Sequence, residues 1–139
     1  MTPSPAAPEK TYTFVLIIWA VMFASVGMYY YLVRTVLQPP KTDPNPLLAY
    51  ILLSLSILMV LASLYFRTRF GASEGQARTL AKVQAGYIIA LAFAEAPALY
   101  GLVVFATSGW PQYWIFFSIS VIAFILNFPR RDAFEQASP

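Results

Sequence analysis

The sequence contains no cysteine and no histidine. Without thiols there is no disulfide, thiolate nucleophile or iron–sulfur site, and without either residue type the usual zinc ligands are missing. The lack of imidazole also removes the common proximal ligand of haem and the common proton relay at neutral pH. We therefore expect no metal site and no cofactor, apart from bound lipid. Any chemistry must come from carboxylates, hydroxyls, amides, basic groups or the backbone.

Charged residues are also scarce, at 11% of the 139 residues, whereas hydrophobic residues make up 59%. A soluble domain usually has roughly a quarter charged residues, so this chain cannot cover itself with a water-soluble surface. The net charge of +3 is compatible with nucleic-acid binding. However, the basic residues stand at the ends of apolar runs and do not form a stripe along one face. The composition predicts an integral membrane protein that contacts the lipid bilayer, not nucleic acid.

Four apolar runs follow one another, separated by segments rich in proline, glycine or basic residues. Roughly twenty uncharged residues suffice to cross a hydrocarbon core of about 30 Å. The runs are continuous, not alternating, which indicates helices and not the strands of a barrel. A signal peptide is the rival interpretation of the first run, but the segment before it is not markedly basic. The sequence predicts an all-α membrane protein, one bundle of four transmembrane helices in a domain of residues 12–129, with helices at about 12–36, 46–67, 80–107 and 111–128.

The two ends of the chain are predicted to be short cytoplasmic tails. Residues 1–11 contain three prolines and are expected to be disordered, and residues 130–139 form the second tail. The bias of lysine and arginine towards one side of the predicted bundle places both termini in the cytoplasm, with the protein in the plasma (inner) membrane. That side collects Lys10, Arg67, Arg69, Arg78, Lys82, Arg130 and Arg131, against Arg34 and Lys41 on the other.

Residues at the predicted membrane surfaces have more than one interpretation. The pairs Arg67/Arg69 and Arg130/Arg131 can bind anionic lipid headgroups, although their effect on topology explains them equally well. Aromatic residues near helix ends are typical interfacial anchors. They can equally fill the bundle or contact another subunit. These aromatic residues are Tyr29, Tyr30, Tyr31, Trp110, Tyr113 and Trp114.

Glu95 interrupts the third apolar run about twelve residues, or roughly 18 Å, from either end. An ionised carboxylate at that depth costs several kcal/mol unless it is paired, so we expect it to be neutral or matched by a partner. No lysine or arginine lies at comparable depth in the four runs. The partner is therefore a basic residue of another subunit or a hydroxyl of this chain, with candidates Ser25, Ser54, Ser56, Ser63, Ser118, Ser120 and Tyr100.

Pro97 follows Glu95 inside the same predicted helix. Because proline has no N–H, it leaves the carbonyl of Phe93 without its helical partner and predicts a kink at this point. Small residues recur every three or four positions around Glu95, and such a face lets a neighbouring helix approach closely. This helix-packing face consists of Gly86, Ala90, Ala94, Ala98 and Gly101.

The segment from Leu91 to Val104, LAFAEAPALYGLVV, resembles the C-terminal helix of subunit c, the rotor-ring proteolipid of F-type ATP synthases. The resemblance implies that Glu95 is an ion-binding carboxyl and that Tyr100 helps to orient it. Ala96 stands where sodium-binding members carry a hydroxyl, which favours protons. The chain departs from the family in three ways. The family's Arg-Gln-Pro loop is missing, and Gly75-Gln76-Ala77-Arg78 is only a faint echo of it. The second apolar run, Leu47 to Phe66, lacks the glycine repeat of the family's partner helix, and two helices are additional.

Two functions remain open at this point. In the first, the chain is a proton-handling membrane subunit related to subunit c, with Glu95 as the carrier. In the second, it is an accessory or assembly subunit of a larger respiratory or photosynthetic complex, and Glu95 is a hydrogen-bonding clamp between helices. Both imply other membrane subunits, in a homo- or hetero-oligomer. The sequence has no nucleophile–base pair and no phosphate loop, so we expect no catalytic residues and no catalytic activity of the chain on its own.

Overall fold

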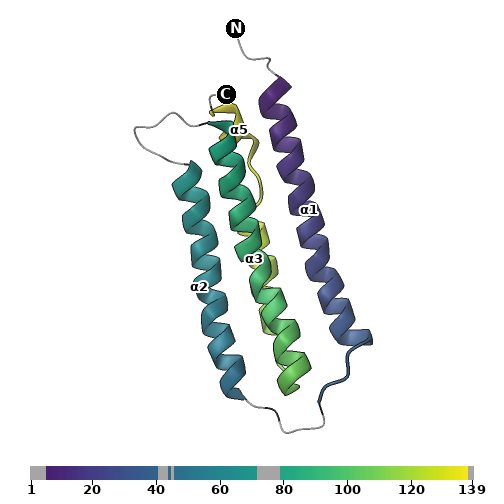
Figure 1. Ribbon diagram of the computed structural model, residues 1–139. Coiled ribbons are helices and arrows are strands. Elements are labelled where there is room, and N and C mark those ends of the chain that lie inside the picture. Colours follow the sequence, from purple (N-terminus) through teal and green to yellow (C-terminus); the bar gives the residue numbers. More distant parts are fainter. Residues whose placement is uncertain (1–5, 41–43, 45, 72–78, 138–139) are drawn as a thin grey trace.

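The computed structural model describes residues 6–40, 44, 46–71 and 79–137 (Figure 1). The basic residues Lys41 and Arg78, and the tail residues 1–5 and 138–139, lie outside the described residues. Every element in the described part is an α-helix, which confirms the predicted all-α class. The helices are α1 (Ala6–Thr35), α2 (Pro46–Gly71), α3 (Leu80–Ser108), α4 (Trp114–Leu126) and α5 (Arg131–Glu135).

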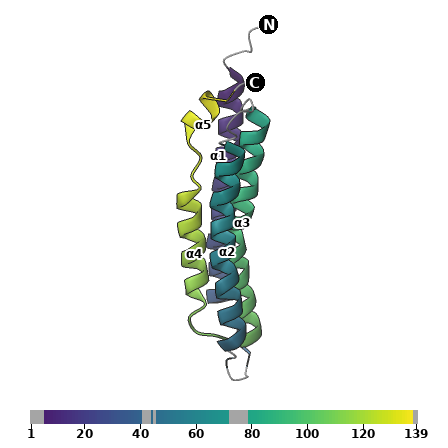
Figure 2. The same cartoon turned by 90° about the vertical axis from the view of Figure 1, so that its left-hand side faces the viewer.

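Helix α3 is the centre of the bundle. It lies between α1 and α2 in Figure 1, and α4 runs along another side of it in Figure 2. Leu91, Ala94 and Ala98 of α3 form the main apolar core together with Val26 of α1 and Phe124 of α4. The short helix α5 sits at the end of the bundle where α1 begins (Figure 1). Because α3 contacts every other helix, it is the most buried of the three long helices.

Three helices are long and apolar enough to cross a membrane: Ala7–Thr35, Pro46–Phe70 and Leu80–Ser108. Apolar residues of these helices also face outward, as in Val21, Leu58 and Leu61, each of which is more than half exposed. Such a surface is unfavourable in water and favourable in lipid. Helix α4 is apolar too, but it has 13 residues, or about 20 Å of helix.

The shortness of α4 differs from the expected helix at 111–128. A turn over residues 111–113 precedes it, with the Tyr113 amide donating to the Trp110 carbonyl at 3.3 Å, and Pro129 follows its end. The last four carbonyls of a helix have no partner within it, yet all four are bonded here. The donors are Asn127 N to Ala123 O, Trp19 Nε1 to Phe124 O, Phe128 N to Ile125 O and Arg67 Nη1 to Leu126 O.

The expected disordered tail at residues 1–11 is wrong for residues 6–11, which form the first turns of α1. Pro8 is compatible with this position because the first amides of a helix have no partner in any case. Glu9 in the first turn is favourable beside the positive end of the helix dipole. The Thr11 hydroxyl donates to the Ala7 carbonyl at 3.0 Å.

The short tail expected at residues 130–139 contains a helix that the sequence did not predict, α5 at Arg131–Glu135, and its cytoplasmic side stays a prediction. Phe134 is fully buried, and its ring lies 5.7 Å from that of Tyr12 and 5.4 Å from that of Tyr87. Burial of this single aromatic side chain attaches the C-terminal segment to α1 and α3. A single residue gives no periodic signal, so the sequence pattern did not predict this helix.

Helix α3 has well-defined ends that agree with the expected 80–107. At its start the Thr79 side chain accepts a hydrogen bond from the Lys82 amide at 3.4 Å. At its end Gly109 has φ 60°, the left-handed conformation in which glycine is favoured, and its amide bonds to the Phe105 carbonyl. Helix α2 continues to Gly71, four residues beyond the expected end at 67.

The five small residues of α3 are all buried, and its two glycines meet different neighbours. A Cβ on Gly86 would lie 2.7 Å from Phe70 Cβ of α2, and one on Gly101 would lie 2.8 Å from Phe116 Cβ of α4. The Ser120 hydroxyl of α4 donates to the Ala94 carbonyl of α3 at 2.7 Å. Small residues on α3 therefore set its close approach to both α2 and α4.

Candidate ion-binding site at Glu95

Glu95 lies near the middle of α3, half-buried at the contact with α1. Its Oε1 atom is hydrogen-bonded to the hydroxyls of Ser25 and Tyr29, with the Tyr29 hydroxyl 3.1 Å away. Ser25 and Tyr29 are four residues apart on α1, a spacing that places two side chains on the same helix face. A single turn of α1 thus presents two hydroxyls to one carboxyl oxygen.

The Ser25 hydroxyl has two neighbours but only one proton to donate. Its Oγ lies 2.6 Å from the Met22 carbonyl oxygen and also contacts Glu95 Oε1. When Glu95 is protonated, its own O–H can donate to Ser25 Oγ while Ser25 donates to Met22. When Glu95 is ionised, Ser25 can instead donate to the carboxylate. The arrangement therefore provides hydrogen bonds for both charge states of the carboxyl.

The second oxygen of Glu95, Oε2, is free among the described residues. Asn127 Oδ1 is the one enclosed side-chain atom without a partner in the described part of the chain, so Oε2 is not sealed inside the protein. No cation in the described ranges pairs with Glu95; the ion pair found there, Arg131–Glu135, is exposed at the end of the bundle. One oxygen is thus held by α1, and the other has no hydrogen-bond partner among the described residues.

Of the candidate partners, Ser25 is the one that contacts Glu95. The other serines donate to main-chain carbonyls, mostly one turn earlier in their own helices, as serine commonly does in apolar surroundings. These bonds join Ser54 to Tyr50, Ser56 to Leu52, Ser63 to Val60, Ser118 to Trp114 and Ser120 to Ala94.

Tyr100, which the resemblance to subunit c assigns as the orienting residue, is not one of the hydroxyls on Glu95. Five residues along a helix correspond to a turn of about 140°, so Tyr100 faces away from α1. It packs against the cluster of Ala49, Val104 and Trp110. The tyrosine whose hydroxyl reaches Glu95 is Tyr29. The sequence places Tyr29 in a group of interfacial aromatic residues. Its spacing of four residues from Ser25 is the sequence signal that could have identified it as a partner of Glu95.

Pro97 is buried in α3, which continues without interruption from Leu80 to Ser108. The ring of Phe93 stacks on that of Phe66 from α2, with centroids 5.3 Å apart and planes at 5°. Phe93 therefore contributes to packing against α2. The predicted kink at this proline stays a prediction.

The arginines expected at the membrane surface have contacts of several kinds. Arg67 donates to the Leu126 carbonyl and thereby caps α4, in addition to any effect on topology. Arg131 pairs with Glu135 at 2.7 Å. The main-chain amide of Arg130 donates to the Tyr87 hydroxyl at 3.3 Å, and Arg69 is exposed near the end of α2.

Asn127, to which the sequence assigned no role, is fully buried at the end of α4. Its Nδ2 donates to Ser63 Oγ of α2 at 2.9 Å and to the Ala123 carbonyl at 2.9 Å. It therefore links the C-terminal end of α4 to α2.

Within the described residues there is no group of three or more acidic side chains placed to hold a metal ion. Comparison of the chain with protein-family models, with curated proteins and with solved structures finds no match. The fold and the site thus define a class only: an all-helical protein with three helices that can cross a membrane, and with one hydroxyl-bonded carboxyl halfway along its central helix.

Proposed function

We propose that this chain is a small polytopic membrane subunit in which Glu95 binds and releases a proton near the middle of the bilayer. The observation that carries the proposal is the pair of α1 hydroxyls on Oε1, together with an Oε2 that has no partner among the described residues. Ser25 can serve the neutral and the ionised carboxyl alike, which lowers the cost of changing between them. Intramembrane carboxyls of this kind commonly lie on proton pathways.

The local likeness of Leu91–Val104 to ATP synthase subunit c supports proton chemistry at the same residue. The placement of Tyr29 on Glu95, and of Tyr100 elsewhere, sets this chain apart from the pattern of that family. A proton reaching Oε2 comes from outside the chain, so net transport across the membrane requires a further subunit or an aqueous path. In this proposal the protein resides in the plasma (inner) membrane with both termini in the cytoplasm.

Infrared difference spectroscopy of the carboxyl C=O stretch, on protein reconstituted in lipid bilayers, tests the proposal. We expect a band of the protonated acid that disappears as the pH is raised and that is absent from Glu95→Gln. Glu135→Gln is the matched control, since Glu135 is exposed at the end of the bundle, and it should retain the band. A Glu95 band that is constant over the whole pH range in which the protein stays folded would contradict proton release.

A second function, that of an accessory or assembly subunit, is favoured by one specific contact. The hydrogen bonds from Ser25 and Tyr29 to Glu95 join α1 to α3, so the carboxyl also has a structural use within the chain. Under this function Glu95→Gln preserves assembly and activity of the complex, because an amide still accepts both bonds. The native mass and subunit composition in mild detergent separate the two. A homo-oligomeric ring supports the rotor-like function, and one or a few copies in an unrelated complex support the accessory function.

A further inference from the structure

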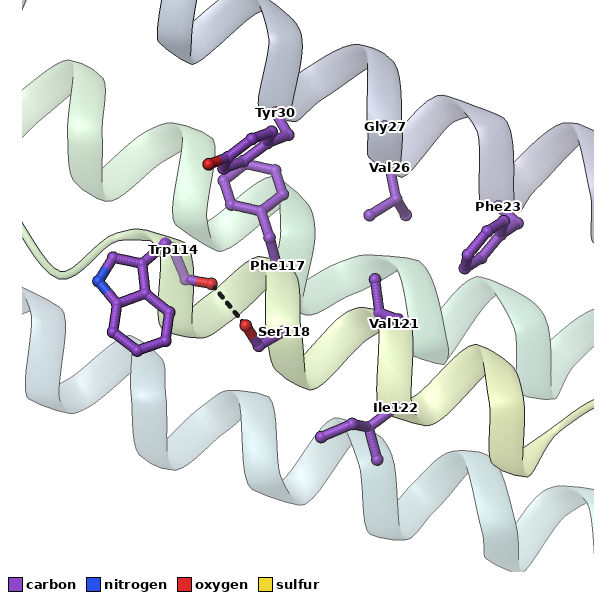
Figure 3. Close-up of a pocket in the computed structure, with 9 residues that line it drawn as sticks. All are labelled: Phe23, Val26, Gly27, Tyr30, Trp114, Phe117, Ser118, Val121 and Ile122. Carbon is purple, nitrogen blue, oxygen red and sulfur yellow. Dashed lines mark hydrogen bonds between the residues drawn. The ribbon is translucent and has the colours of Figure 1, made fainter.

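Helices α1 and α4 border a groove of about 580 Å³ on the outer surface of the bundle (Figure 3). From α1 it is lined by Phe23, Gly27 and Tyr30, and from α4 by Trp114, Ser118 and others. Its volume is within the range of roughly 300–1,000 Å³ that is typical of small-ligand pockets. The groove does not include Glu95, and its role is independent of the proposed proton binding.

The interior of the groove is apolar and contains unfilled space at its middle. The Ser118 hydroxyl is already used, since it donates to the Trp114 carbonyl at 3.2 Å (Figure 3). Gly27 contributes no side chain, and a Cβ placed there would have no atom within 4 Å. Phe117 and Val26 form a buried floor. The middle of the groove therefore suits a flexible hydrocarbon, and the Ser118 hydroxyl there is not free for a polar ligand.

One end of the groove has a positive charge. Tyr30 and Phe117 pack edge to face at that end, with centroids 5.4 Å apart. Arg34 follows Tyr30 by one turn, so it shares a helix face with Gly27 and Tyr30. Its exposed guanidinium interacts with the Tyr113 hydroxyl and lies near Tyr30. No acidic residue accompanies it at this end in the described ranges, where the recorded ion pair is at the opposite end of the bundle.

We propose that this groove binds one acyl chain of an anionic phospholipid whose phosphate pairs with the Arg34 guanidinium. A lipid combines a hydrocarbon chain with a negative headgroup at the membrane surface, which matches an apolar groove with a cation at its end. An apolar helix of a partner would fill the groove but would offer no negative group to Arg34. Tyr30 and Tyr113, which both interact with Arg34, have hydroxyls that can donate to the phosphate.

Trp114 lies in the groove and serves as the reporter. The intact protein is reconstituted in phosphatidylcholine vesicles that contain a minor fraction of brominated lipid, either phosphatidylglycerol or phosphatidylcholine, because bromine on an acyl chain quenches nearby tryptophan. The Trp114→Phe variant gives the contribution of Trp19 and Trp110, which is subtracted. We expect the brominated anionic lipid to quench Trp114 at about fivefold lower mole fraction than the neutral lipid, the effect of one basic residue at a membrane surface.

Two variants and one matched control complete the test. Arg34→Gln should remove the preference for the anionic lipid, whereas Arg69→Gln, which removes an exposed arginine from the far end of the bundle, should retain it. Gly27→Leu should fill the groove and reduce quenching of Trp114 by both lipids, while the helicity measured by circular dichroism stays unchanged.

Equal quenching by the two lipids in the wild-type protein overturns the proposal. So does weak quenching by both together with cross-linking of Trp114 to a second copy or another subunit, since a protein then occupies the groove.

Discussion

The Ser25 hydroxyl lies within hydrogen-bond distance of two oxygen atoms but has only one proton to donate, so its donor direction depends on the charge of Glu95. Residues with this property respond to the charge of a neighbour without any movement of the backbone. A serine bonded only to its own helix, such as Ser54, has no such choice. The difference between the two serines can be measured.

Replacing Ser25 with alanine should therefore affect both stability and protonation. We expect the free energy of unfolding to fall by about 0.6–1.7 kcal/mol, the range for interhelical hydrogen bonds in membrane proteins. We also expect the infrared band of the protonated Glu95 carboxyl to shift in frequency. Ser54→Ala, measured by the same unfolding assay in mixed micelles and the same spectra, should change neither quantity appreciably.

Tyr29→Phe and Tyr100→Phe form a second matched pair. The first removes a hydroxyl 3.1 Å from Glu95 Oε1, whereas the second removes one from a different cluster. Tyr29→Phe should alter the Glu95 carboxyl band and lower the unfolding free energy by about 0.6 kcal/mol, and Tyr100→Phe should leave the band unchanged. A band that responds to Tyr100→Phe and not to Tyr29→Phe would contradict the site geometry and favour the arrangement implied by subunit c.

At the residue scale, the sequence predicted the unusual group but only part of its surroundings. A carboxyl in an apolar run is conspicuous, and Ser25 was among seven candidate hydroxyl partners that the sequence could not rank. Tyr29 was not recognised as a partner, because aromatic residues near a helix end are more often interfacial anchors. The choice between Tyr29 and Tyr100 depends on how α1 is rotated against α3. That rotation is a property of the packed bundle.

At the scale of elements, the glycines of α3 and α1 differ in what surrounds them. Gly86→Ala and Gly101→Ala each place a methyl group under 3 Å from a Cβ atom of a neighbouring helix, so we expect a loss of about 1–3 kcal/mol from overpacking. Gly27→Ala meets nothing within 4 Å and should be neutral or stabilise α1 by up to about 1 kcal/mol. Unfolding in mixed micelles checks all three. Equal effects at the three glycines would contradict the close packing of α3.

The ends of the elements were harder to predict than their existence. The three long helices have about twenty apolar residues each, a signal that needs no partner to be read. In contrast, α4 ends sooner than the sequence predicts, and this end depends on Trp19 of α1 and Arg67 of α2. Both side chains donate hydrogen bonds to the last carbonyls of α4. Helix α5 depends on a single ring, Phe134, finding its place against Tyr12 and Tyr87. Both features arise from contacts between distant parts of the chain.

For the molecule as a whole, the segment after α4 decides how many times the chain crosses the bilayer. Residues 127–130 are extended or turn-like, and non-helical backbone in an apolar layer needs partners for its amides. The amides of Asn127 and Phe128 bond to carbonyls of α4, that of Arg130 bonds to the Tyr87 hydroxyl, and Pro129 has no N–H. With about 20 Å of helix in α4 and about 3.3 Å for each extended residue, the chain covers roughly the thickness of the hydrocarbon core.

We therefore expect four crossings, with the start of α1 and the end of the chain on the same side, where Tyr12 meets Phe134. Since the sequence has no cysteine, single-cysteine variants can be labelled with a membrane-impermeant maleimide without background. Glu9→Cys and Glu135→Cys should react from one side of sealed vesicles, and Gln112→Cys, in the turn before α4, from the other. The lysine and arginine bias assigns the first side to the cytoplasm.

If Glu135→Cys reacts from the same side as Gln112→Cys, then α4 enters the bilayer without crossing it. In that case Phe134 cannot remain packed on Tyr12, and the unfolding free energy should become insensitive to Phe134→Ala, whose expected cost with α5 in place is about 3–5 kcal/mol.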